Sequence, residues 1–234
     1  MVRKSVFIAF FLSLVFKVFG FTPSTHDSEQ NPAEEILRSA RMNPTNHPAT
    51  LHARIRGAGS PTTLTIRLRD HLISYEFEHP QQSILLELGP TSTLLSERIN
   101  GSSHPIDGAL LHKPIRDTGV TYEDLSMGFL YWPGAVLQGE QTIRTRPAWK
   151  IDLQAPVSES LYGVARVWID KESGAILRIE GYDKKGLLIR RFEIVSAQKI
   201  DGLWMLKQMR IESFSPGNDQ EAISRNYLEI LGKE

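Results

Sequence analysis

The fold is decided by residues 163–196, which read GVARVWIDKESGAILRIEGYDKKGLLIRRFEIVS. Three runs rich in β-branched and aromatic residues, 163–170, 175–182 and 187–196, are separated by polar clusters that begin with Asp and end with Gly. Such runs favour strands, and Asp followed by Gly a few residues later is typical of a tight turn. The stretch therefore predicts three consecutive antiparallel strands joined by short turns.

The same rhythm extends to both sides of this stretch. Further strands are expected over 148–153, 203–213 and 225–231, and Asp201-Gly202 supplies another turn. Four more strands are expected between residues 51 and 88, where apolar and polar side chains alternate with a period of two. Such alternation gives one buried and one solvated face, which is typical of antiparallel sheets. The connections are short enough for hairpins, so the sequence predicts about ten strands in meanders.

Two helices interrupt the strands. The first is expected to begin at Pro32, with Asn31 as its cap, and to end at Asn43-Pro44. The second is expected to follow Thr121 and to end at Trp132-Pro133-Gly134, with Leu125 and Phe129 four residues apart on one face. Between the strands and this helix, residues 89–119 are rich in Pro, Gly and Ser and are expected to be irregular.

Composition excludes several classes of protein. The 234 residues contain no cysteine, which excludes a disulfide framework, thiolate metal sites and cysteine catalysis. The 27 basic and 27 acidic side chains balance, which argues against a nucleic-acid-binding protein. Hydrophobic residues make up 41% of the chain, so one domain of this length can bury a core of its own.

The first twenty residues have the pattern of a secretory signal peptide. Arg3 and Lys4 precede an apolar run from Val6 to Phe19, and cleavage is expected after Gly20. The alternative is an uncleaved membrane anchor, although the run is shorter than a bilayer requires and Lys17 interrupts it. Residues 21–31 are expected to form a flexible segment, and residues 32–234 a single domain.

Residues that could perform chemistry do not form a recognisable constellation. The seven histidines lack zinc-ligand spacing, and the chain has no nucleophile elbow or phosphate-binding glycine loop. The pair Glu123-Asp124 could act in acid–base chemistry, but the simpler interpretation makes Asp124 part of a helix capping box. We therefore expect no metal, no cofactor and no catalytic residue.

A basic row lies on the polar faces of two neighbouring strands, at His52, Arg54, Arg56, Arg67 and Arg69. This row could bind an acidic partner or lipid head groups. The simpler interpretation is that these side chains pair across strands with acids such as Glu76 and Glu78.

The expected sheet has a large apolar face that other parts of the chain must cover. Its aromatic residues, such as Trp149, Trp168 and Trp204, are by default expected in the core. Two short helices cannot cover about ten strands completely. Either the sheet closes on itself, or it leaves an apolar cavity under a lid, which is where ligands commonly bind.

With this pattern the chain resembles the LolA-like outer-membrane lipoprotein-sorting proteins, in an uncharacterised exported branch. The resemblance spans residues 32–231 and rests on the order of short motifs: VTYEDL at 120–125, VWIDKESG at 167–174, IEGYD at 179–183, Gly186, and DGLW at 201–204. It implies an α+β fold, in which the N-terminal and central helices cover a curved antiparallel half-barrel.

The resemblance also implies a function. A periplasmic carrier, expected to be a monomer, would shelter the acyl chains of lipoproteins during transfer from an inner-membrane exporter to an outer-membrane acceptor. The alternatives are a periplasmic lipid sensor, an accessory of a lipid exporter, or a lipid or glycan hydrolase. Candidates for the apolar cavity are Leu64, Ile66, Leu68, Phe77, Leu86, Leu125, Phe129, Val167, Ile169, Leu177, Ile179, Met209 and Ile211.

Overall fold

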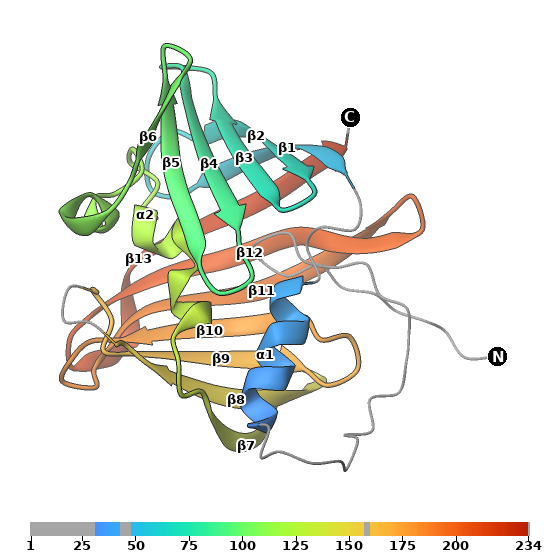
Figure 1. Ribbon diagram of the computed structural model, residues 1–234, viewed down its shortest axis with the longest axis vertical. Coiled ribbons are helices and arrows are strands. Elements are labelled where there is room, and N and C mark those ends of the chain that lie inside the picture. The colour runs from blue at the N-terminus through green and yellow to red at the C-terminus, as the bar shows by residue number, and fades with distance from the viewer. Residues whose placement is uncertain (1–30, 43–47, 157–159, 234) are drawn as a thin grey trace.

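A single antiparallel sheet organises the computed structural model, which describes residues 31–42, 48–156 and 160–233 (Figure 1). Within these residues the sheet has thirteen strands in the order β6-β5-β4-β3-β2-β1-β13-β12-β11-β10-β9-β8-β7. Strands that follow each other in sequence are neighbours in the sheet, except β6 and β7, which form its two edges. Strand β1 pairs with β13. The last strand thus joins a first half, β1–β6, to a second half, β7–β13.

The first half of the sheet is a continuous meander. The expected four strands are confirmed and two more follow them: β1 Ala49–Arg56, β2 Thr62–Arg69, β3 Leu72–Phe77, β4 Gln82–Leu88, β5 Thr93–Ile99 and β6 Ser102–Pro105. The expectation of an irregular stretch over 89–119 is therefore wrong in part. Asn100 and Gly101 have φ angles of 50° and 84° and form a two-residue hairpin turn between β5 and β6.

The second half contains the strands that the motif-rich stretch predicted, together with one more at its edge. Its members are β7 Val136–Ile143, β8 Arg146–Gln154, β9 Val164–Asp170, β10 Ile176–Tyr182, β11 Leu188–Ile200, β12 Leu203–Ser215 and β13 Asn218–Lys233. The strand count of about ten was too low because β5, β6 and β7 were missed. Strand β7 lies at the sheet edge and is mostly exposed, so it lacks the alternation that marks a half-buried strand.

Helix α1, Pro32–Met42, begins as expected. The side chain of Asn31 accepts a hydrogen bond from the backbone N–H of Ala33 at 3.0 Å, which confirms the cap. Ala33, Leu37 and Ala40 form its buried face, and the helix contacts β7 and β9. The end expected at Asn43-Pro44 lies outside the described residues.

The central helix is shorter than expected. In α2, Tyr122–Ser126, Thr121 and Asp124 form the expected capping box, with hydrogen bonds of 3.1 and 2.8 Å. The helix ends at Met127, whose φ of 53° is left-handed, and a 3₁₀ turn, η2 Gly128–Tyr131, follows. Leu125 and Phe129 are both buried but do not share one helix face, so that expectation was wrong.

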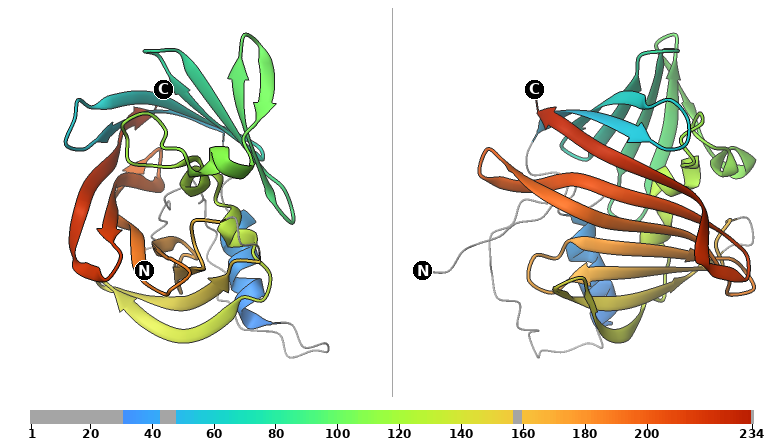
Figure 2. Two further views of the ribbon diagram at one scale, coloured as in Figure 1. Left: turned by 90° about the vertical axis from the view of Figure 1, so that its left-hand side faces the viewer. Right: turned by 180° about the vertical axis from the view of Figure 1, so that it is seen from behind.

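The sheet curves but does not close. Strands β6 and β7 are its two edges, and Figure 2 shows the strands curling around α1, α2 and the connecting segments of residues 106–135. A further 3₁₀ turn, η1 Gly108–His112, belongs to these segments. One apolar core lies between the concave face and this filling. Among the described residues, no helix has both the length and the hydrophobicity needed to span a membrane.

Candidate binding cavity

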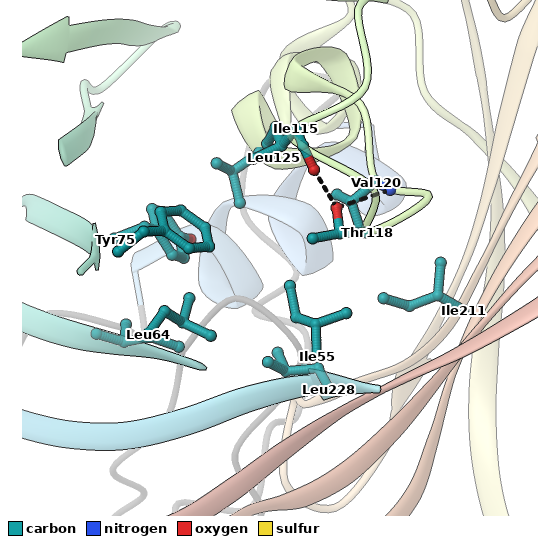
Figure 3. A pocket seen from close by; sticks show the side chains of 11 residues that line it. Ile55, Leu64, Tyr75, Ile115, Thr118, Val120, Leu125, Ile211 and Leu228 are labelled. Carbon is teal, nitrogen blue, oxygen red and sulfur yellow. Dashed lines mark hydrogen bonds between the residues drawn. The ribbon is translucent and has the colours of Figure 1, made fainter. Parts of the chain in front are cut away.

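An apolar cavity lies on the concave side of the sheet, between its first half and residues 115–125. The space between its lining side chains is about 490 Å³ when the solvent at its mouth is included, and about 30 Å³ of it is free for a water-sized sphere. Figure 3 shows side chains from β1–β3, from β12 and β13, and from residues 115–125 surrounding this space. The lining residues are Ile55, Leu64, Ile66, Tyr75, Phe77, Ile115, Thr118, Val120, Leu125, Ile211 and Leu228.

The floor of the cavity is formed by apolar side chains on one face of neighbouring strands. In β2, Leu64 and Ile66 lie two residues apart and therefore point to the same face. Cross-strand register extends this apolar face, because Tyr75 lies opposite Ile66 and Leu228 lies opposite Ile55. Residues directly opposite each other in a sheet point to the same side. The floor is thus a continuous apolar surface from β3 to β13.

Residues 115–125, which we call the cover segment, form the opposite wall. The backbone N–H of Ile115 donates to the carbonyl of Val120 at 2.7 Å, which closes a compact turn. The hydroxyl of Thr118 donates to the carbonyl of Ile115 at 2.6 Å and accepts from the N–H of Val120 at 3.3 Å. The turn therefore satisfies its own polar groups and presents apolar side chains to the cavity.

A buried polar cluster anchors the cover segment to the second half of the sheet. Asp124 accepts a short hydrogen bond from the hydroxyl of Tyr162 and lies 3.4 Å from the guanidinium of Arg190. Arg190 also donates to the carbonyl of Gly119 at 2.8 Å and to the hydroxyl of Ser213 at 2.5 Å. Burial raises the pKa of Tyr162, and the charge of Asp124 raises it further, so the phenol stays protonated and donates. One arginine thus holds the cover segment at two points, near its middle and near its C-terminal end.

The neighbouring acid, Glu123, has a separate anchoring role. Its carboxylate accepts from the hydroxyl of Ser160 at 2.5 Å and from the backbone N–H of Leu161 at 3.0 Å. His112 lies 3.8 Å away. These contacts tie α2 to the loop before β9, so Glu123 and Asp124 hold structure rather than face a cleft together. In the described ranges, no cluster of three or more His, Asp or Glu side chains could hold a metal ion.

The structure separates the thirteen cavity candidates into three groups. Five line the cavity: Leu64, Ile66, Phe77, Leu125 and Ile211. Three line a second, smaller space on the second half of the sheet that is too narrow to admit a water molecule: Leu177, Ile179 and Met209. The other five are buried in the core and line neither space: Leu68, Leu86, Phe129, Val167 and Ile169.

Sequence reasoning did not select six of the lining residues. Ile55 and Tyr75 lie on alternating apolar rows that the sequence displays, so this signal could have identified them. Leu228 lies in the expected last strand. The other three, Ile115, Thr118 and Val120, come from a turn without periodicity, and no local pattern marks them.

The basic row on the polar face of β1 and β2 forms ion pairs within the sheet. Arg67 lies 3.0 Å from Glu76, as cross-strand pairing predicts. Arg54 and Arg56 instead bind Glu229 on β13, at 2.6 and 2.9 Å. The hydrogen bond from Arg56, together with those from Arg54 and Gln208, outweighs burial and lowers the pKa of Glu229 to about 2. Much of the row is therefore neutralised by acids of this chain.

Solved structures with the same fold are distant in sequence. A DUF1329 family protein from Desulfovibrio piger matches with a TM-score of 0.57 and 18% identity, over 88% of this chain and 93% of that one. A domain assigned to the outer membrane lipoprotein-sorting proteins, from Vibrio parahaemolyticus, matches with a TM-score of 0.63 and 18% identity, over 87% of this chain and 92% of that domain. A LolA superfamily protein from Nitrosomonas europaea matches with a TM-score of 0.61 and 16% identity, over 86% of this chain and 92% of that one. The fold is therefore LolA-like.

Comparisons by sequence add one match. A family model with the description "Uncharacterized protein" matches residues 102–226. No curated protein matches the chain. The matched region contains the cover segment, strands β7–β12 and the first part of β13.

Proposed function

Since the chain belongs to the family whose model spans residues 102–226 and has a LolA-like fold, we propose that it is a periplasmic lipid carrier. Its cargo is the acyl portion of a lipoprotein, sheltered during transfer towards the outer membrane. The chain acts by binding and has no catalytic step. The signal peptide expected over residues 1–20 supports export.

The observation that carries this proposal is the apolar cavity under the cover segment. Nine of its eleven described lining residues have side chains made only of carbon and hydrogen. In this closed arrangement only about 30 Å³ is free for a water-sized sphere, well below the roughly 300–1,000 Å³ of small-molecule sites, so a ligand enters when the lining side chains move apart. Burial of an acyl chain releases about 0.8 kcal/mol per CH₂, so such a surface offers binding free energy to a lipid.

The free volume also bears on how cargo enters. In the closed arrangement the free space of about 30 Å³ is too small for a whole acyl chain. Binding of a lipoprotein anchor therefore requires the cover segment to move away from the floor. The segment has a small set of anchors, centred on Asp124 and Arg190, whose release would open the cavity without breaking the sheet.

The test is to purify the mature chain from Phe21 onward, extract it with organic solvent and analyse the extract by mass spectrometry. We expect a stoichiometric acylated species, and we expect the delipidated protein to take up diphenylhexatriene, a fluorescent hydrocarbon. A protein that is empty and takes up no probe would contradict the proposal.

Transfer separates a carrier from a sensor. A carrier should deliver a fluorescent triacylated lipopeptide to acceptor vesicles faster than the lipopeptide crosses the buffer unaided. A lipopeptide that binds but stays on the protein would favour the alternative of a lipid sensor.

A further inference from the structure

The hydroxyl of Tyr75 is a polar group without a partner inside an apolar cavity. Tyr75 is 5% exposed, and its hydroxyl oxygen is buried with no hydrogen-bond partner in the part of the chain that the structure describes. It lies in the middle of β3, between Ile66 of β2 and Ile84 of β4. Figure 3 shows its ring extending among the other lining side chains. More than nine in ten buried polar groups in proteins are hydrogen-bonded, so this hydroxyl requires an explanation.

Packing alone does not explain the hydroxyl. Phe77, two residues further along β3, lines the same cavity with a ring that has no polar atom. A phenylalanine at position 75 would keep the apolar contacts and avoid the cost of a buried, unbonded hydroxyl. Thr118 offers no partner, because its hydroxyl is already bonded within the cover segment. In the empty protein the hydroxyl therefore opposes stability.

The surroundings define what could bond to this hydroxyl. Burial raises its pKa, so the phenol is a neutral donor at physiological pH. Among the residues that the structure describes, no cationic side chain lines the cavity. Arg116 of the cover segment lies 4.4 Å from the Phe77 ring centroid, but its guanidinium donates to Gln82 and to backbone carbonyls outside the lining. A carboxylate placed here would be buried without a counter-charge, which one hydrogen bond does not offset.

We propose that Tyr75 is the specificity-determining contact of the cavity and donates a hydrogen bond to a neutral oxygen on an otherwise hydrocarbon ligand. The class of ligand is an acyl chain with an ester or amide carbonyl, or a hydroxyl, at the depth of β3. Free carboxylates and plain alkanes bind less well. This inference rests on the proposed lipid-binding function and narrows its ligand.

The experiment compares the full mature protein with Tyr75→Phe, using diphenylhexatriene as the bound probe. Methyl laurate, which has an ester carbonyl, and tridecane, which has no oxygen, compete for the probe. We expect the substitution to weaken the binding of methyl laurate by roughly threefold to tenfold, which is the usual contribution of one hydrogen bond. The binding of tridecane should not change. Dodecanol tells whether the ligand group is a carbonyl or a hydroxyl. If Tyr75→Phe weakens the binding of dodecanol more than that of methyl laurate, the contact is assigned to a hydroxyl.

Stability provides a second readout. Tyr75→Phe should be at least as stable as the wild type when empty, because it removes an unbonded buried hydroxyl. Tyr162→Phe is the matched control and should be less stable, since that hydroxyl donates to Asp124. Equal effects of Tyr75→Phe on ester and alkane, or no effect on either, would overturn the inference while the carrier proposal stands. Failure of the wild type to take up the probe would overturn both.

Discussion

The carboxylate of Asp124 lies 3.4 Å from the guanidinium of Arg190, and their side chains are 0% and 13% exposed. Asp124 belongs to α2 and Arg190 to β11, so the contact joins the cover segment to the second half of the sheet. Because Arg190 also binds the carbonyl of Gly119, it holds the segment at two points. The covering of the cavity therefore depends on a residue that does not line it.

We predict that Arg190→Met lowers the free energy of unfolding by about 3–5 kcal/mol, because it leaves the Asp124 carboxylate buried without its partner. Chemical denaturation measures this loss. Hydrogen exchange of the amides of residues 119–125 should also become faster, since the cover segment loses its anchor.

The control for this prediction is Arg225→Met, which removes an exposed arginine from the buried carboxylate of Glu212 but leaves that carboxylate a second arginine, Arg210, at 3.1 Å. Because Glu212 stays paired with Arg210, we expect a smaller loss of stability than for Arg190→Met, and unchanged exchange in the cover segment. Similar exchange rates in the Arg190 and Arg225 variants would show that the cluster does not hold the segment.

A second prediction concerns Gly181, which lies beneath the ring of Tyr162. A Cβ atom at position 181 would be 2.3 Å from Cε1 of that ring, so Gly181→Ala must displace it. Overpacking of this kind costs about 1–3 kcal/mol, and the displaced phenol would also lose its bond to Asp124. Thermal and chemical unfolding measure the effect.

The matched control is Gly232→Ala in β13, where an added Cβ meets no atom within 4 Å. We expect this variant to be as stable as the wild type or slightly more stable, since alanine restricts the unfolded chain. Equal losses in both variants would mean that the loss in Gly181→Ala does not come from the Tyr162 contact.

The sequence allowed most of the sheet to be predicted because most strands have one wet and one buried face. Alternation along β2 reflects that environment directly. Strand β7 has no such environment, because it is an exposed edge strand, so its sequence does not alternate between apolar and polar residues. For β5 and β6 a signal did exist, because Asn100-Gly101 is a strong hairpin dipeptide that the surrounding prolines and serines obscured.

The cavity was less predictable than the sheet. Alternation identifies the face of a residue such as Leu177 but does not tell which part of a long curved face stays open. That depends on where the cover segment lies, and its position is set by long-range contacts such as Asp124–Arg190. Thr121 and Asp124 were foreseen as a cap because both lie within one turn of chain, whereas Arg190 comes from a distant strand.

A third prediction tests the cavity by filling it. Ile55 is half-buried at the β1 side of the lining, so the larger ring of Ile55→Trp should occupy the space without a severe loss of stability. We expect uptake of diphenylhexatriene to fall at least tenfold, measured by fluorescence titration. Val136→Trp on β7 is the control, because Val136 is 51% exposed and does not line the cavity. Equal uptake by both variants and the wild type would place the probe elsewhere.

The fourth prediction concerns acid stability and Glu229. Hydrogen bonds from Arg56, Arg54 and Gln208 lower its pKa in the folded protein to about 2, from an ordinary value of 4.5. The unfolded chain therefore binds a proton at Glu229 at a higher pH than the folded chain does. This carboxylate contributes its full stabilisation above about pH 5, and the contribution is lost as the pH falls from 4.5 towards 2.

We predict that Glu229→Gln is less stable than the wild type at pH 7 by about 1 kcal/mol, since its arginine partners are half-exposed and water screens them. Between pH 5 and pH 2 the variant should lose less stability than the wild type, so their unfolding free energies converge. Urea unfolding at stepped pH values measures both curves. Glu221→Gln, at an exposed position of the same strand, should follow the wild type throughout. Parallel curves for Glu229→Gln and wild type would show that Glu229 titrates alike in the folded and unfolded chains.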